Sequence, residues 1–251
     1  FLQSPLLVTP WLEIPKLRVL KYLISKLIFF INHKHVDAFI VQTSIMKEKL
    51  LSVYPIPNNK IHIISQPVPV WIKEDNSYYK KSYTPGAGLD LIYPAAYYPH
   101  KNHALLSKIE SSAKDWPVSN LGLTIPIDKN PAPKINWIIC LGQLNQKDML
   151  KKYYSVDAML FLSIEESFGF PLIEAMYLDL PIICPDLPFA RVLCGDEALY
   201  FDPNDIDSLK EQILLLDEKL KNGWMPNWKI QLQKIPNDWK EVSNRMIALC
   251  I

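Results

Sequence analysis

Two carboxylates, Glu166 and Glu174, lie eight positions apart in the run ESFGFPLIE, around a glycine and a proline. The apolar residues before this run are typical of a strand, and Pro171 suits the first position of a helix, where its missing N–H costs nothing. Gly169 would let a ligand approach the backbone closely. We expect the free N–H groups of residues 172 and 173, at the positive end of the helix, to form a site for a phosphate or a sugar hydroxyl.

The spacing of the two glutamates has a second interpretation. In one continuous helix, eight residues would leave the two side chains roughly 12 Å apart along the axis, on a solvated surface with nothing to join them. Pro171 argues against such a helix because a proline disfavours the α conformation in the residue before it, Phe170. With Glu166 before the turn and Glu174 one turn into the helix, both can face one small cleft. The spacing by itself leaves both interpretations open.

The same segment resembles the signature of the family-4 retaining glycosyltransferases, in which two glutamates are separated by seven residues and which have the two-domain GT-B fold. The residues after it are also similar to that family, namely residues 175–176, LPIICP at 180–185, FARVLCG at 189–195 and ALYFDP at 198–203. Upstream, YYPHKNH at 97–103 resembles the lysine loop of the family, and residues 37–43 and 61–68 resemble the end of its N-terminal domain. Residues 69–88 and 107–134 match least.

The resemblance implies a role for each matching residue. By resemblance, Glu166 is the catalytic residue and contacts hydroxyls of the donor sugar beside the reacting carbon, and Glu174 accepts hydrogen bonds from the ribose. Lys101 suits the leaving diphosphate because it is a compact cation on a flexible stem. The other donor-binding residues that the resemblance implies are Phe168, Gly169, Phe170, Pro171 and Leu172 at the helix start, and Gly142, Gln143 and Leu144 beside the base.

The chain also departs from the family pattern. Most relatives have an arginine five positions before the lysine, where this chain has Ala96, and a histidine often precedes the glutamine near the start, where it has Leu2. Residues 1–68 are too few for the whole N-terminal domain of that family. We therefore expect its opening strands and the glycine-rich loop on the acceptor side to be absent, and the chain to be a fragment, one half of a split enzyme or a degenerate gene product.

Strand and helix patterns alternate along the chain, which is typical of a parallel α/β architecture. We expect strands at 36–43, 61–64, 89–94, 120–125, 137–141, 157–162, 181–184 and 199–201, and helices at 45–53, 103–113, 147–154, 171–178, 205–220 and 238–249. The fold class is thus α/β of the GT-B type. A partial N-terminal Rossmann-like domain is expected over 1–68, a linker over 69–88, a Rossmann-like C-terminal domain with a parallel sheet that binds the nucleotide sugar over 89–235, and a closing helix over 236–251 that returns to the N-terminal domain.

Composition excludes several function classes. The 251 residues are 49% hydrophobic, which supports real cores, and their net charge of +1 gives no reason to expect nucleic acid as a partner. His100 and His103 lack an acidic partner nearby, so we expect no metal and no other cofactor, with the nucleotide sugar as a substrate. The four cysteines form no C-x-x-C pair, and Cys140 and Cys184 fall in strand-like runs, which predicts buried free thiols.

Residues 17–31 (LRVLKYLISKLIFFI) read as an amphipathic helix, and no stretch of the chain is apolar enough for a membrane span. One interpretation packs this helix on a sheet, and the other places its basic face on anionic lipid, which an enzyme with a lipid-linked acceptor would use. The expected location is cytoplasmic, with a peripheral contact on the inner face of the membrane.

The sequence therefore predicts a retaining glycosyltransferase of polysaccharide biosynthesis, which moves a hexose from a UDP- or GDP-sugar to a glycan or lipid-linked acceptor. The alternative is a non-catalytic module that binds a nucleotide sugar, or the donor half of a split transferase. Leu2, Ala96 and the incomplete first domain favour that alternative. A nucleotide-sugar epimerase or a phosphorylase on the same fold would carry its own signature, which this chain lacks.

Overall fold

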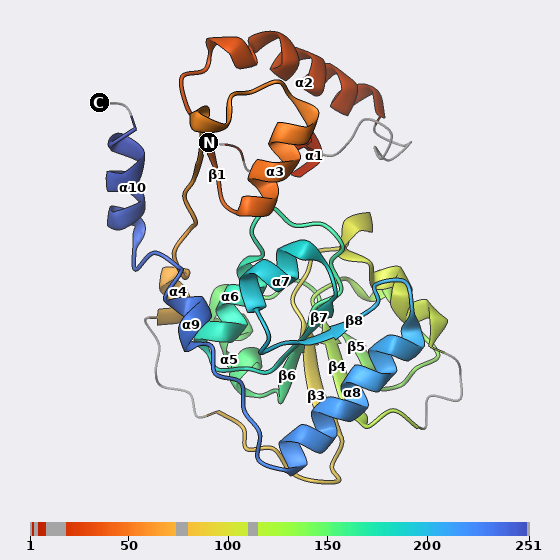
Figure 1. Ribbon diagram of the computed structural model, residues 1–251. Coiled ribbons are helices and arrows are strands. Elements are labelled where there is room, and N and C mark those ends of the chain that lie inside the picture. The colour runs from red at the N-terminus through yellow and green to blue at the C-terminus, as the bar shows by residue number, and fades with distance from the viewer. Residues whose placement is uncertain (1, 3–4, 9–18, 74–79, 110–114, 250–251) are drawn as a thin grey trace. The chain divides into compact units, whose positions relative to one another are not determined.

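The computed structural model of the chain describes residues 2, 5–8, 19–73, 80–109 and 115–249 (Figure 1). These residues divide into two compact units. The first unit contains the described residues up to Pro67, the short stretch Glu166–Phe168 and the described residues from Ile235 onward. The second unit contains the described residues of Val68–Glu165 and Gly169–Lys234.

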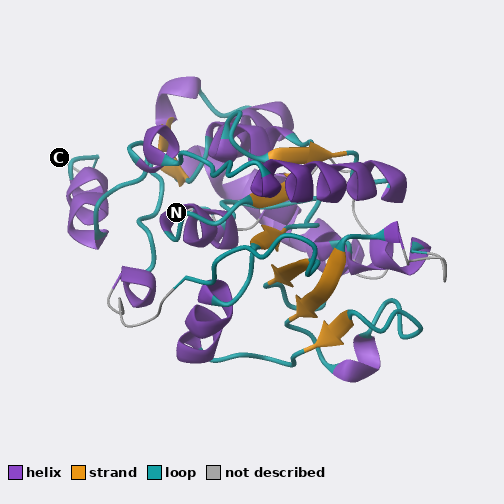
Figure 2. Ribbon diagram, turned by 90° about the horizontal axis from the view of Figure 1, so that it is seen from below, coloured by secondary structure: helices purple, strands orange, loops and turns teal. Residues whose placement is uncertain are grey.

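The second unit is built on a sheet of six strands, all of whose neighbours pair in parallel (Figure 2). Its spatial order is β5-β4-β3-β6-β7-β8. The strands are β3 (Leu89–Tyr93), β4 (Val118–Leu123), β5 (Ile138–Cys140), β6 (Ala158–Leu160), β7 (Ile182–Pro185) and β8 (Leu199–Phe201). Apolar runs form these strands because a parallel sheet is covered on both faces. At the centre, Leu91, Leu121 and Ala158 lie abreast, and none is more than 1% exposed.

The strand order contains one reversal. The chain adds β4 and β5 on one side of β3, and then returns to place β6, β7 and β8 on the other side. This is the order of the doubly wound Rossmann fold, in which ligands bind outside the carboxyl ends of the strands at the point of reversal. In this sheet the reversal lies between β3 and β6.

Helices α5 (Gln146–Tyr154), α6 (Phe170–Tyr177) and α7 (Pro188–Cys194) connect strands of the second unit, with 3-10 turns η5 (Pro99–Lys101), η6 (His103–Lys108) and η8 (Ile127–Lys129). Helix α4 (Val70–Lys73) precedes the sheet in the chain, and α8 (Ile206–Lys221) and α9 (Lys229–Leu232) follow it. The side chains of Asn145 and Asp205 cap the first turns of α5 and α8 by accepting backbone N–H groups. The buried stripe of α8, Leu209, Ile213, Leu216 and Leu220, has the spacing that the sequence predicts.

An ionic network joins the amino ends of β3 and β6. Lys81 Nζ lies 2.5 Å from Asp90 Oδ2 and 2.9 Å from Asp157 Oδ2. Ser119 Oγ and Asn120 Nδ2 each donate to Asp90 Oδ1 at 2.7 Å, and Asp90 N donates to Asp157 Oδ2 at 2.8 Å. Burial raises the pKa of Asp90, but these donors together outweigh it and hold the pKa below its ordinary value. The network therefore holds charged Asp90 at this end of the sheet.

The first unit contains a smaller parallel pair, β1 (Phe39–Val41) with β2 (Ile61–Ile63). Its helices are α1 (Pro5–Val8), α2 (Val19–Asn32), α3 (Ser44–Val53) and α10 (Trp239–Ile247), with turns η3 (His33–His35) and η4 (Asn58–Lys60). Thr43 Oγ1 caps α3 by accepting Met46 N at 3.2 Å. The core gathers Phe39, Val41, Met46 and Leu50, and Phe29 of α2 packs against it.

Several segments differ from the sequence-based expectation. The helix expected at 103–113 is the 3-10 turn η6 up to Lys108, and residues 110–114 lie outside the described part. Helices α1, α4, α7 and α9 were not predicted, because four to seven residues are too few for a clear periodicity. Cys140 is only half-buried, at the end of edge strand β5, whereas Cys184 is buried as expected. The other expected strands and helices are present, and their ends differ by a few residues.

Candidate functional site

The loops that follow β3 and β6 are joined at the point of reversal of the sheet. Ile164 N donates to His100 O at 2.9 Å, and Ser163 Oγ donates to the same oxygen at 3.2 Å. Because both strands run parallel, their carboxyl ends deliver these loops to one edge of the sheet. The lysine loop is thereby tied to the segment that leads into the ESFGFPLIE run.

Lys101 ends the 3-10 turn η5 on the first of these loops. Its carbonyl accepts the Tyr93 hydroxyl at 2.6 Å, and its N–H donates to Tyr98 O at 3.0 Å. The next residue, Asn102, has a left-handed backbone (φ 52°), which asparagine tolerates, and its Nδ2 donates to Pro203 O at 3.0 Å. The backbone of Lys101 is therefore fixed on both sides, while its side chain stays partly exposed.

A cavity of about 460 Å³ opens at the carboxyl ends of β3, β4 and β5. Among the predicted donor-binding residues, Gln143 and Leu144 line it. The rest of its lining comes from the loops after β3 and β4 and from α5, namely Pro94, Ala95, Ala96, Tyr97, Tyr98, Thr124, Pro126 and Met149. Gly142 turns the chain into this lining with φ +68°, a backbone conformation that favours glycine.

The start of α6 differs from the expectation in one respect. The N–H groups of Leu172 and Ile173 are not free, because both donate to Gly169 O, at 3.0 and 3.4 Å. Gly169 has φ +90°, and a Cβ there would lie 3.2 Å from Leu193 Cδ1 and 3.3 Å from Leu172 Cδ1. The backbone conformation and these contacts by themselves favour glycine, and the close approach of a ligand stays a prediction. Pro171 follows Phe170, the first helical residue, and Leu172 is fully buried.

The two glutamates have different environments. Glu174 is only 9% exposed, and its Oε2 accepts the Tyr153 hydroxyl at 2.7 Å. Burial raises the pKa of Glu174 from 4.5 to about 7, against the opposing effect of the Tyr153 hydrogen bond. Glu166 is half-buried and, with the buried Phe168, groups with the first unit. The structure therefore does not test whether the two carboxylates share a cleft.

Beyond the predicted set, His103 is the most unusual polar group near Lys101. It is 2% exposed, and neither ring nitrogen has a hydrogen-bond partner among the described residues. Burial, with a smaller contribution from the charge of Lys101, lowers the pKa of His103 from 6.5 to about 4. The imidazole is therefore neutral at physiological pH.

Comparisons with known proteins agree with this geometry. Residues 134–227, from before β5 to before α9, match the family model of the glycosyl transferases group 1. O-antigen chain mannosyltransferase B of Escherichia coli is 33% identical over 78 residues, which is 31% of this chain and 20% of that protein. O-antigen chain mannosyltransferase RfbU of Salmonella typhimurium is 22% identical over 189 residues, which is 69% of this chain and 49% of that protein. The chain matches no more than half the length of either relative.

Among solved structures, a glycosyltransferase from Rickettsia africae matches 94% of this chain and 67% of its own chain, with a TM-score of 0.66 and 17% identity. A variant of S. aureus TarM in complex with Fondaparinux, alpha-GlcNAc-glycerol and UDP matches 90% of this chain and 46% of its own, with a TM-score of 0.67 and 16% identity. The fold is that of the GT-B glycosyltransferases.

Within this GT-B fold, the lysine loop and the loop after β5 lie at the carboxyl ends of the strands. The described residues contain no group of three or more His, Cys, Asp or Glu side chains that could hold a metal ion. Metal independence stays a prediction. No helix in the described part of the chain is long and apolar enough to cross a membrane.

Sequence reasoning missed Tyr97, Tyr98 and His103 as members of the site. The run YYPHKNH marked the lysine loop, and its two adjacent tyrosines directly after an apolar strand were the available signal. A surface loop rarely needs two consecutive aromatic residues for packing alone. The burial of His103 gave no local signal, because it depends on contacts with β3 and with the rest of the loop.

Proposed function

We propose that this chain carries the donor-binding part of a retaining, family-4 glycosyltransferase, which moves a hexose from a UDP- or GDP-sugar to a glycan or lipid-linked acceptor. Both relatives named above are mannosyltransferases of O-antigen chains, which supports mannose as the hexose. Polysaccharide assembly is the corresponding process. We assign this chain only the donor-binding part of the activity, because the matched region covers no more than half the length of either relative.

The cavity beside the lysine loop carries the proposal. A nucleotide sugar needs a recess for its base and a cation for its diphosphate, and the residues from Pro94 to Lys101 supply a wall of the cavity and a lysine in one loop. The site lies where open α/β sheets bind ligands, at the carboxyl ends beside the reversal of strand order. A solved neighbour, Anabaena Alr3699/HepE in complex with UDP, matches 84% of this chain with a TM-score of 0.63 and 14% identity.

Three side chains have separate roles in the proposed chemistry. Cleavage of the donor develops negative charge on the diphosphate and positive charge on the sugar ring. Lys101 would neutralise the diphosphate, and Glu166 would contact the sugar hydroxyls beside the reacting carbon. Glu174 already accepts Tyr153 with one carboxylate oxygen, and its other oxygen would accept a ribose hydroxyl. No metal is part of the proposal.

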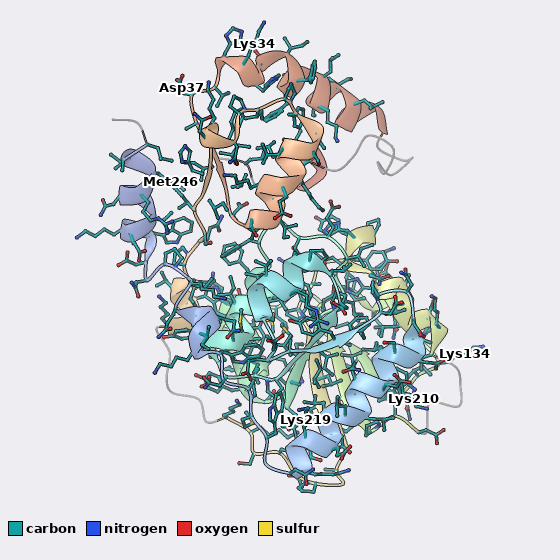
Figure 3. The ribbon with its side chains drawn as sticks, in the orientation of Figure 1. Lys34, Asp37, Lys134, Lys210, Lys219 and Met246 are labelled. Carbon is teal, nitrogen blue, oxygen red and sulfur yellow. The ribbon has the colours of Figure 1, made fainter. Side chains whose placement is uncertain are left out.

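Calorimetry with UDP and GDP, with and without EDTA, tests the proposal. Lys101→Ala should weaken nucleoside diphosphate binding by about 1.5–3 kcal/mol, or roughly ten- to a hundredfold, because it removes a charge-assisted contact. The affinity for the free nucleoside should barely change. The control is Lys134→Ala, at an exposed lysine of the same unit that projects from the surface (Figure 3). Equal losses for diphosphate and nucleoside would contradict the role of Lys101, and loss of binding in EDTA would contradict metal independence.

Turnover separates an enzyme from a binding module. Glu166→Gln keeps the shape of the side chain and removes its charge, so it should lower transfer or donor hydrolysis more than tenfold while nucleotide affinity changes less than about threefold. A chain that binds nucleotide but turns over no donor, with acceptor or with water, would support the module instead.

We further propose that α2 lies on anionic lipid. Ile24, Leu27, Ile28 and Ile31 form a stripe at helical spacing, and each is at least 50% exposed. This exposed face is apolar, whereas the sequence suggested a basic one; Lys26 is buried. Residues 1–67 contain eight Lys or Arg and three Asp or Glu, so this part of the sequence is basic although the whole chain is only +1. Lys34, just after α2, points outward (Figure 3).

Vesicle sedimentation tests this contact. The chain should bind vesicles that contain anionic phospholipid more tightly than neutral ones, and Leu27→Glu should abolish the difference, since it places a negative charge in the apolar stripe. Leu51→Glu, at an exposed leucine of α3 in the same unit, is the control. Equal binding by the wild type and Leu27→Glu would exclude α2 as the contact.

A further inference from the structure

Two aromatic residues line the cavity, Tyr97 and Tyr98. Both residues are about half exposed, at 52% and 49%. Exposed tyrosines beside a recess are unusual for packing alone, because a tyrosine ring gains free energy by burial. They are therefore candidates for contacts with a bound molecule.

A series of ring contacts connects Tyr97 to the core of the sheet, and we call these rings a column. The Tyr97 ring lies 5.6 Å from the His103 ring at 35°, and His103 lies 4.9 Å from Tyr93 at 36°. Tyr93 meets Phe161 edge-on at 6.1 Å. Phe161 and Tyr93 are fully buried and His103 is 2% exposed, and of these four residues Tyr97 alone belongs to the cavity lining.

The backbone around Tyr97 is also fixed. Ala95 N donates to Tyr93 O at 3.2 Å, and Thr124 Oγ1 donates to Ala95 O at 3.3 Å from the neighbouring strand end. Tyr98 N donates to Ala96 O at 3.0 Å. A tyrosine has only two side-chain torsions, so a ring with a fixed backbone and one supported face loses little entropy when a second ring stacks on it.

Tyr98 differs from Tyr97 in its support. Its ring stacks on His100 at 5.7 Å and 8°, and His100 is itself only half-buried. The Tyr98 ring therefore rests on a surface side chain and not on the core. Of the two rings in the cavity wall, Tyr97 is the one held in place before a ligand arrives.

We propose that Tyr97, held by the His103–Tyr93–Phe161 column, is the platform on which the nucleobase of the donor stacks. The assignment rests on the proposed function, since it needs a nucleotide in this cavity. The lysine lies four residues further along the same loop, so one loop contacts both the base and the diphosphate. Because every base has a flat face, Tyr97 supplies affinity without base identity. Polar groups of the cavity wall, such as the Gln143 amide, then determine which base is bound.

The test compares ligands with and without a base. Tyr97→Ala should weaken UDP and GDP binding at least tenfold and leave inorganic pyrophosphate within twofold, because only the base contacts the ring. Tyr97→Phe keeps the ring and should bind all three ligands within threefold of the wild type. Tyr98→Ala is the comparison at the second tyrosine of the cavity wall, and its loss should be at least threefold smaller than that of Tyr97→Ala. Isothermal calorimetry on the whole chain measures all four proteins.

Three results would overturn the assignment. Equal losses for UDP and pyrophosphate in Tyr97→Ala would show a general disturbance of the loop. A loss in Tyr97→Phe as large as in Tyr97→Ala would assign the contact to the hydroxyl, and a larger loss in Tyr98→Ala would assign the platform to Tyr98. In each case the wild type still binds nucleotide, so the proposed function stands. A wild type that binds neither UDP nor GDP would overturn the proposed function and this inference with it.

Discussion

The polar groups at the two ends of the six-stranded sheet differ in their hydrogen-bond partners and in their burial. At the amino end, Lys81, Asp90, Ser119 and Asn120 bond to one another, and Asp157 Oδ1 is the one oxygen of the network that is buried without a partner among the described residues. At the carboxyl end, both His103 nitrogens lack partners among these residues, and Glu174 is buried with its pKa raised to about 7.

Unsatisfied or desolvated polar groups destabilise a fold, so the burial of His103 and Glu174 calls for a reason other than stability. The amino end stabilises the sheet with charges. At the carboxyl end, the proposed ribose contact would give the second oxygen of Glu174 a partner. Variants at the amino end should therefore change stability alone, whereas Glu174→Gln at the carboxyl end should change both stability and binding.

The largest effect is expected at Lys81. Lys81→Met would leave Asp90 and the 1%-exposed side chain of Asp157 without their cation, which should lower the free energy of unfolding by about 3 kcal/mol, the lower end of the range for buried pairs because Lys81 is partly solvated. Urea unfolding measures it, and nucleotide affinity should not change. Lys210→Met, at the loose 4.0 Å pair with Asp115, should change stability by less than about 0.5 kcal/mol. Similar losses for both variants would remove the contrast between the two ends.

Glu174→Gln should stabilise the protein by about 2 kcal/mol at pH 8, since the charged form is the one that burial disfavours. The folded-state pKa of about 7 lies above the ordinary 4.5, so the wild type loses stability as pH rises between these values. The gain should therefore shrink at pH 5, where the wild-type carboxyl is protonated in the folded state. Unfolding at both pH values measures it.

Glutamine still accepts the Tyr153 hydroxyl, so the variant changes charge more than packing. Nucleotide binding should weaken if Glu174 contacts the ribose. Greater stability with unchanged nucleotide affinity would leave the buried carboxylate without a functional reason.

The smallest effect is expected at His103. Its folded-state pKa of about 4 lies below the ordinary 6.5, so protonation favours unfolding and stability falls as pH drops through this window. Between pH 7 and pH 5.5 this group should lower the free energy of unfolding by about 1 kcal/mol. His103→Phe keeps a ring in the column and should remove that part of the pH dependence. An identical pH profile in the variant would show that His103 is not held neutral.

The sequence predicts the strands and helices that position the site better than it predicts the contacts that their residues make. Apolar runs and prolines place the strands and the start of α6, because both act on the local backbone. The occupied N–H groups of Leu172 and Ile173 could not be read in the same way, since they depend on how tightly the first turn closes on Gly169. The tilted ring contact of Tyr97 with His103 and the exposed apolar stripe of α2 depend on tertiary structure, which no local pattern records.

The reversal of strand order also bears on how the chain folds during its synthesis. β3, β4 and β5 can pair as soon as they have emerged, whereas the second edge of β3 is filled only by β6. Between Tyr93 and Ala158 the nascent chain therefore presents one open, apolar edge of β3, which is a template for association with other chains. At typical elongation rates this interval lasts on the order of 3–13 s. Among the strands that have a neighbour on both sides in the folded sheet, the one that delivers the lysine loop is thus exposed longest to misassembly.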